Sequence, residues 1–216
     1  MPNYCSNRLD FTGPSSDIIK LKNFVATESS LFDFNKIIPM PPEIRDTQRG
    51  SLSYASEAVV LYLQNKEVSS HLKWMMEREQ ADFANFPILV EKWEKEKRVD
   101  LELGKRILNN RQLYQGCGDW YEWSIENWGT KWDACDPEIG ETTIIYDTAW
   151  SPSLPVIETL AAKFPQLTFT YQYFEPGVAL AGCTIFENGK CSKSNVYCLQ
   201  DEKYFDIGRI FGYEFT

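Results

Sequence analysis

The stretch 151–173, SPSLPVIETLAAKFPQLTFTYQY, decides the fold class because a helix pattern leads directly into a strand pattern. Apolar residues first recur at the i, i+3, i+4 and i+7 spacing of one helix face: Ile157, Leu160, Ala161 and Phe164. Pro165 ends this helix. Apolar residues then alternate with polar ones, as in a half-buried strand: Leu167, Phe169, Tyr171 and Tyr173.

Strand signals flank this stretch on both sides. Residues 142–146 before it have strand character, and Asn188-Gly189 after it predicts a hairpin with a two-residue type I′ turn. The turn fixes the register of the hairpin. Three cross-strand pairs are therefore expected: Glu187 with Lys190, Phe186 with Cys191, and Cys183 with Ser194.

The N-terminal segment supplies the remaining elements. Residues 4–12 alternate like a strand, the turn 13–17 offers helix N-caps, and a helix follows to about Thr27. Residues 31–38 are apolar enough for a second strand. The order is then strand, helix, strand, strand, helix, strand, with an added hairpin. This order predicts an α+β fold, a ferredoxin-like split βαβ sheet with helices on one face.

A Glu/Lys-rich stretch with helical periodicity interrupts this order. We expect residues 43–116 to form an α-helical insertion, and residues 1–42 and 117–216 to form the ferredoxin-like sheet domain. Within the insertion, helices are expected to pack on each other through Trp74 and Trp93. Residues 66–111 contain 10 Lys or Arg and 9 Asp or Glu, so this block is nearly neutral.

Composition excludes several classes of protein. The chain has 216 residues, a formal charge of −9 and 43% hydrophobic residues, which is enough to bury a core. The acidic balance argues against general nucleic-acid binding and anionic-membrane binding. The start of the chain lacks the apolar segment of a secretory signal, and the longest apolar run is residues 58–63. A cytoplasmic location in a bacterial cell is expected.

The cysteines and the single histidine limit the chemistry. No two of the six cysteines form a C-x-x-C pair, and the predicted hairpin puts Cys183 and Cys191 on opposite faces. We therefore expect reduced cysteines and no iron–sulfur cluster. One histidine, His71, excludes multi-histidine metal sites. Neither a G-x-S-x-G nor a phosphate-binding glycine motif occurs, so no catalytic residue and no cofactor are predicted.

Two overlapping features provide candidate partner-binding residues. Five aromatic residues fall within positions 120–132, and residues 112–175 hold ten acids against two bases. The aromatic block is either core or an exposed anchor patch, and the acidic residues form either a solvated face or a docking surface for a basic partner. The candidates are Trp120, Glu122, Trp123, Glu126, Trp132, Asp133, Asp136, Glu138 and Glu141.

Several motifs together resemble one family. They are MPNYCSNRL at the start, FDFNKIIPMP at 32–41, WYEW at 120–123, NWGTKW at 127–132, TAWSP at 148–152, YFEPG at 173–177, and Ala181-Gly182. In these motifs the chain resembles the YubB ferredoxin-like domain proteins of bacterial plasmids and phages. The resemblance implies a ferredoxin-like fold and a mobile-element origin, and it brings no known catalytic residues.

Three hypotheses on function follow. The first is a non-enzymatic interaction protein of a mobile genetic element that binds a host protein and inhibits host defence or nucleic-acid-processing machinery. The second is an RRM-like nucleic-acid binder in which Tyr171 and Tyr173 stack bases on an open sheet face. The third is a metal-dependent hydrolase that uses the carboxylates of residues 133–141, although their spacing matches no EF-hand.

Overall fold

Six antiparallel strands form one sheet in the computed structural model, which describes residues 3–215. The strand order is β2-β3-β1-β4-β5-β6. The bounds are β1 Tyr4–Thr12, β2 Cys135–Ile139, β3 Thr143–Ala149, β4 Thr168–Glu175, β5 Leu180–Glu187 and β6 Lys190–Tyr197. Strand β1 lies between β3 and β4 and is antiparallel to both. This is the order of the split βαβ fold, so the predicted α+β ferredoxin-like class is confirmed.

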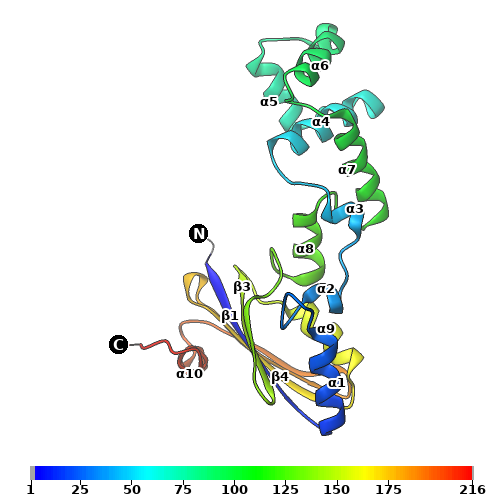
Figure 1. Ribbon diagram of the computed structural model, residues 1–216. Helices are drawn as coiled ribbons and strands as arrows, with labels where there is room; N and C mark the ends of the chain where they lie inside the picture. The colour runs from blue at the N-terminus through cyan, green and yellow to red at the C-terminus, as the bar shows by residue number, and fades with distance from the viewer. Residues whose placement is uncertain (1–2, 216) are drawn as a thin grey trace. The chain divides into compact units, whose positions relative to one another are not determined.

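Two helices cover one face of this sheet, α1 (Ser15–Val25) and α9 (Leu154–Lys163), whereas α10 (Glu202–Ile210) lies on the other (Figure 1). The alternation in β1 explains the division, because Leu9 and Phe11 are fully buried while Asp10 between them is half-buried. On the opposite face, Phe174 and Ala181 pack with apolar residues of α10. The prediction of helices on one face therefore holds for α1 and α9 and misses α10.

The expected strand at 31–38 is wrong. The segment contains the short helix α2 (Phe34–Ile37), because the Asp33 side chain accepts a hydrogen bond from the backbone N–H of Asn35 and caps it. The second strand of the ferredoxin-like order is β2 instead. Pairing with β3 makes β2 a strand although it contains Asp136, Pro137 and Glu138, which disfavour strands.

The β5–β6 hairpin has the predicted turn. Asn188 and Gly189 have φ values of 52° and 74°, the left-handed conformation that a type I′ turn requires. Glu187 faces Lys190 and Phe186 faces Cys191, as expected. A register shift between Ile185 and Phe186 then places Cys183 opposite Asn195 rather than Ser194. All six cysteines are free: Cys5, Cys117, Cys135, Cys183, Cys191 and Cys198.

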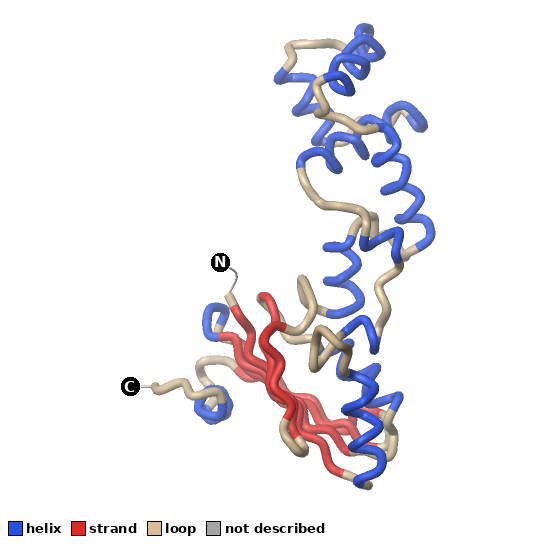
Figure 2. The backbone as a smooth tube through the Cα atoms, viewed as in Figure 1, coloured by secondary structure: helices blue, strands red, loops and turns tan. Residues whose placement is uncertain are grey.

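The chain divides into two compact units, Met1–Pro39 with Ser124–Thr216, here the sheet unit, and Met40–Trp123, here the helical unit. The helical unit therefore begins after Pro39 and ends at Trp123, whereas the sequence predicted a helical insertion that begins after residue 42 and ends at residue 116. Figure 2 shows the strands confined to the sheet unit. Across the described residues, helices that combine sufficient length and apolar character to cross a membrane are absent.

The helical unit contains α3 Pro42–Arg45, α4 Ser51–Asn65, α5 Ser70–Arg78, α6 Phe86–Lys95, α7 Leu101–Leu113 and the start of α8, Trp120–Trp128. Its core includes Val59, Leu72 and the fully buried Trp93. Helices α4 and α7 approach closely because Gly104 has no side chain, and a Cβ there would collide with the Ser56 carbonyl. Trp74 is 50% exposed, so the expectation that it packs between helices is wrong.

Candidate functional site

A buried polar network organises one end of the sheet. The Asn7 amide donates to the Thr148 hydroxyl at 2.9 Å, and the Tyr171 hydroxyl donates to the Asn7 side-chain oxygen at 2.6 Å. The Ser153 backbone N–H donates to Tyr171 at 3.0 Å, and Ser153 also contacts the Tyr146 hydroxyl at 2.8 Å. Burial raises the pKa of both tyrosines, so they remain neutral. This network gives a structural role to Asn7 of the MPNYCSNRL motif and to Thr148 of the TAWSP motif.

The same network excludes one proposed use of the sheet. Tyr171 is fully buried and Tyr173 is 4% exposed, so neither can stack a base on an open face. On the other face of β1, Arg8 is paired with Asp10 at 2.8 Å. The RRM-like prediction for these two tyrosines is therefore wrong, because their side chains lie on the buried face rather than the open one.

Trp150 is an exposed residue with an unusual backbone conformation. Its φ is 72°, which is rare for a bulky residue, and its side chain is 49% exposed. Its backbone N–H donates to the Asn3 carbonyl at 2.9 Å. No pattern in the sequence distinguishes this tryptophan from the others as exposed.

Two of the five residues of the aromatic block are buried. Trp123 and Trp128 are 5% and 4% exposed, and the Trp128 indole N–H donates to the Ile38 carbonyl at 3.0 Å. Trp120 and Trp132 are half-buried, and the Lys131 ammonium lies 4.6 Å from the centre of the Trp132 ring. The core alternative therefore describes Trp123 and Trp128, and Trp123 is not accessible to a partner.

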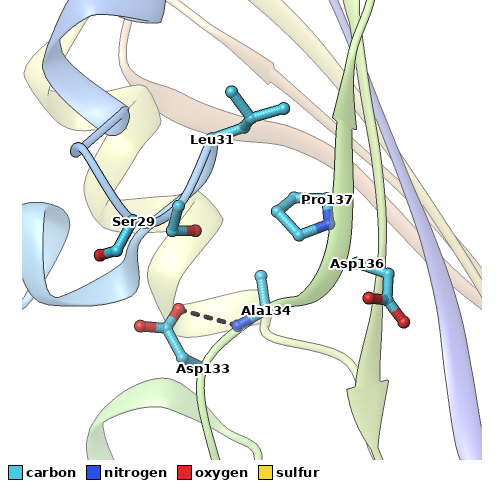
Figure 3. Close-up of a pocket in the computed structure, with 7 residues that line it drawn as sticks. Ser29, Leu31, Asp133, Ala134, Asp136 and Pro137 are labelled. Atoms are coloured by element: carbon cyan, nitrogen blue, oxygen red, sulfur yellow. Dashed lines mark hydrogen bonds between the residues drawn. The ribbon is translucent and has the colours of Figure 1, made fainter.

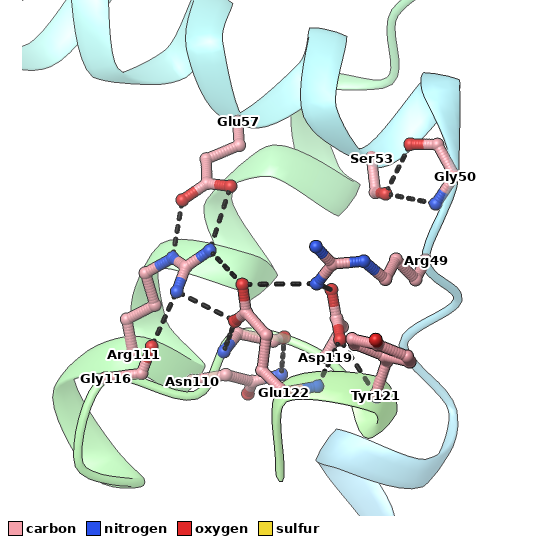
Figure 4. Close-up of polar contacts among 11 residues, drawn as sticks. Arg49, Gly50, Ser53, Glu57, Asn110, Arg111, Gly116, Asp119, Tyr121 and Glu122 are labelled. Carbon is pink, nitrogen blue, oxygen red and sulfur yellow. Dashed lines mark hydrogen bonds and ion pairs between the residues drawn. The ribbon is translucent and has the colours of Figure 1, made fainter. Parts of the chain in front are cut away.

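Glu122 belongs to an ion-pair network inside the helical unit (Figure 4). Arg111 contacts Glu57 at 2.5 Å and Glu122 at 2.8 Å, and Arg49 contacts Glu122 at 3.3 Å and Asp119 at 3.2 Å. Partial burial opposes ionisation of Glu122, but hydrogen bonds from Arg111 and from a backbone N–H lower its pKa. Glu122 and Asp119 therefore fasten α4, α7 and α8 locally rather than forming an acidic surface.

Four further candidate acids lie in the sheet unit, outside any ion-pair network of the described residues. Asp136 and Glu138 are exposed on β2, an edge strand, and Glu141 is exposed in the turn that follows. Glu126 is exposed near the end of α8. Within residues 3–215, no Lys or Arg forms an ion pair with any of these four carboxylates. Their negative charge is directed to solvent.

A pocket of about 400 Å³ lies beside the start of β2 (Figure 3). Its lining comes from two segments of the sheet unit: Ser29, Ser30 and Leu31 on one, and Asp133, Ala134, Asp136 and Pro137 on the other. Two of the predicted site residues, Asp133 and Asp136, therefore meet at one cavity. The serines were missed because neither a motif nor a charge distinguishes them.

Asp133 has both a structural and an electrostatic role in this pocket. Its Oδ1 accepts hydrogen bonds from the backbone N–H groups of Phe34 at 2.9 Å and Ala134 at 2.8 Å. Burial raises its pKa to about 6, the nearby Asp33 carboxyl adds to the rise, and the two N–H donors oppose it. At neutral pH Asp133 is therefore mostly ionised, and a cation in the pocket would be favoured.

The geometry does not assemble a preformed metal site. Among the described residues, no three or more His, Cys, Asp or Glu side chains are grouped so that they could hold a metal ion. The carboxylates of residues 133–141 are spread along β2 and the turn after it, and Asp133 already accepts two backbone hydrogen bonds. This arrangement suits a side chain that donates hydrogen bonds better than it suits a bare divalent cation.

A match to a protein-family model supports the fold. Residues 127–206 match the family described as the ferredoxin-like domain in Api92-like protein. The chain is also similar to the crystal structure of a protein api92 from Yersinia pseudotuberculosis, with 14% identity and a TM-score of 0.46, over 91% of this chain and 98% of that one. No curated protein matches the chain. A ferredoxin-like domain is thus supported, and the YubB resemblance and mobile-element origin stay predictions.

Proposed function

We propose that the protein is a non-enzymatic interaction protein whose sheet unit binds a basic partner protein at the edge strand β2. The observation that supports this most directly is the set of exposed carboxylates at this edge, Asp136, Glu138 and Glu141, which lack a cationic partner among residues 3–215. Uncompensated charge of one sign steers an oppositely charged partner and favours its correct orientation.

The pocket beside β2 adds a place for one specific contact. A lysine or arginine side chain of the partner would lay its apolar stem against Leu31, which is 52% exposed, and against Pro137. Its charged end would then approach the Asp133 and Asp136 carboxylates. An arginine suits this role because it donates several hydrogen bonds in a fixed plane.

The chemistry of the edge also favours one class of partner. Proteins that bind nucleic acid typically carry a surplus of Lys and Arg on the binding surface. An acidic edge would compete with nucleic acid for that basic surface. Together with the predicted mobile-element origin, this favours a host defence protein or a nucleic-acid-processing protein in the bacterial cytoplasm. Binding would inhibit such a protein by covering its basic surface, which requires no catalysis.

Capture with matched baits tests the proposal. The baits are the wild-type chain, the double variant Glu138→Lys/Glu141→Lys, and the control Glu158→Lys, which changes an exposed carboxylate on α9 of the same unit. From a lysate of the bacterium that carries the gene, we expect a basic protein on the wild-type and control baits, lost from the double variant and weakened by salt. Equal capture by all three baits, or by none, contradicts the proposal.

A further inference from the structure

A second pocket, in the helical unit, is basic and aromatic rather than acidic. It has a volume of about 240 Å³ and lies between the first turn of α4, one face of α5 and the turn after α6. His71, Trp74, Arg78, Lys97 and Arg98 line it, and its lining contains no carboxylate. This character contrasts with the chain's net charge of −9.

The spacing along α5 produces the aromatic wall. His71, Trp74 and Arg78 lie three and four residues apart, which puts them on one helix face. The His71 and Trp74 ring centres are 5.5 Å apart, and the Arg78 guanidinium lies 5.4 Å from the centre of the Trp74 ring. Leu72 and Met76 are buried on other sides of the helix and hold it in place. Trp74 therefore offers a ring that is half exposed and already next to a cation.

The turn after α6 supplies two further cations. Arg98 is fixed by Glu79, which its guanidinium contacts at 2.6 Å, so it is largely neutralised. Lys97 is exposed, with a φ of 56°, and lies in the same turn. Within the described part of the chain, neither Lys97 nor Arg78 has a carboxylate ion-pair partner. Arg78, which lies beside the Trp74 ring, and Lys97, which lines the same pocket, are thus available to bind an anion.

The start of α4 completes the site. Ser51 is the first residue of this 15-residue helix, and Ser51 and Leu52 both line the pocket. The first backbone N–H groups of a helix lack intrahelical acceptors and, with the helix dipole, favour an anion. A phosphate there would also lie within the field of Arg78 and Lys97.

We propose that this pocket binds one phosphorylated nucleoside, with the base stacked on Trp74 and the phosphate held by Arg78, Lys97 and the N-terminus of α4. The stacking ring and the paired cations next to it are the two groups that such a ligand needs. The volume of about 240 Å³ is below the roughly 300–1,000 Å³ of pockets that enclose drug-sized ligands, so a nucleotide would be enclosed only in part and would remain partly in solvent. The source is a free nucleotide or the phosphorylated end of a single strand. The proposal is independent of the function assigned to the sheet unit.

Isothermal titration calorimetry of the full chain at low salt tests this inference. The probes are the ribonucleoside monophosphates, the matching nucleosides, inorganic phosphate, and a 5′-phosphorylated tetranucleotide. We expect a monophosphate to bind more tightly than either its nucleoside or phosphate alone, because both halves of the site are engaged. Tighter binding of the tetranucleotide identifies a strand end as the source, and tighter binding of the monophosphate identifies the free nucleotide.

Three variants localise the binding. Trp74→Ala should lower the affinity about tenfold, the loss that corresponds to one base stack. Lys97→Gln should also weaken binding of the monophosphate but leave that of the nucleoside unchanged. Lys95→Gln, an exposed cation on α6 outside the pocket, is the matched control and should bind like the wild type. Absence of binding by every probe at millimolar concentration, or equal losses in Lys97→Gln and Lys95→Gln, would overturn the proposal.

Discussion

The two units use their acidic residues in opposite ways. In the helical unit, three carboxylates form ion pairs with two arginines: Glu57, Asp119 and Glu122 with Arg49 and Arg111. These ion pairs stabilise the unit locally. In the sheet unit, the carboxylates along β2 face solvent, and no ion pair joins them to a cation within residues 3–215. Residues 112–175, which form one acidic stretch in the sequence, therefore divide into two regions with different roles. Only the second leaves charge available for a partner.

The largest effect should come from removing the cation that the helical unit depends on. Arg111→Ala leaves Glu57 and Glu122 half-buried without their main partner. Breaking a fully buried pair costs about 3–5 kcal/mol, and partial exposure reduces this, so we expect a loss of about 1–3 kcal/mol in unfolding free energy. Urea denaturation followed by circular dichroism measures it. Arg106→Ala, an exposed change on the same helix, is the control, and equal losses would contradict a structural role for the network.

A smaller loss is expected at Asp133, the candidate acid of the sheet unit that accepts two backbone hydrogen bonds. Asp133→Ala leaves the backbone N–H groups of Phe34 and Ala134 without their acceptor, which should cost about 1–2 kcal/mol of unfolding free energy. Asp133→Asn keeps an oxygen in place and should cost less. Urea denaturation of both variants in parallel measures the two losses. If Asp133→Asn is as unstable as Asp133→Ala, the lost hydrogen bonds are not the cause of the lower unfolding free energy.

The pH dependence of stability separates the charge of Asp133 from its hydrogen bonds. Its pKa of about 6 in the folded chain lies above the ordinary value of 3.8, so the folded state binds the proton more tightly. The resulting stabilisation is fully present below pH 4 and is lost as the pH rises through 6. The unfolding free energy of the wild type minus that of Asp133→Asn should therefore fall between pH 4 and 6. A difference that stays constant or rises would contradict the raised pKa.

The smallest effect on stability is expected at the β2 edge. Glu138→Lys/Glu141→Lys changes exposed carboxylates that have no ion-pair partner in the described chain, so unfolding free energy should shift by no more than about 0.5 kcal/mol. Thermal melting by circular dichroism checks this. A large loss would show that these carboxylates are structural, and the contrast between the two units would fail.

The sequence predicted the fold where local pattern and tertiary pairing agree. The helix and strand within 151–173 and the Asn188-Gly189 turn show this agreement. The prediction failed at 31–38, where a local Asp33 cap forms a short helix in an apolar segment. It also failed to find β2, because Asp136-Pro137-Glu138 becomes a strand only through pairing with β3.

The site was predicted in part for a related reason. Charge counting identified the acids, but which of them are neutralised depends on Arg49, 70 positions from Asp119 in the chain. Helical spacing likewise could not show that Trp93 is buried while Trp74 is exposed, because that depends on how α5 and α6 pack. Such long-range contacts leave no local pattern in the sequence.

The most direct test of the account is site-specific photo-crosslinking along the acidic edge. A photoreactive phenylalanine derivative replaces Glu138 in one version of the chain and Glu158, on the exposed side of α9, in another. If the partner binds at the β2 edge, position 138 should give a crosslinked adduct with a basic protein and position 158 should give none. An adduct from position 158 alone, or from neither position, would contradict binding at the β2 edge.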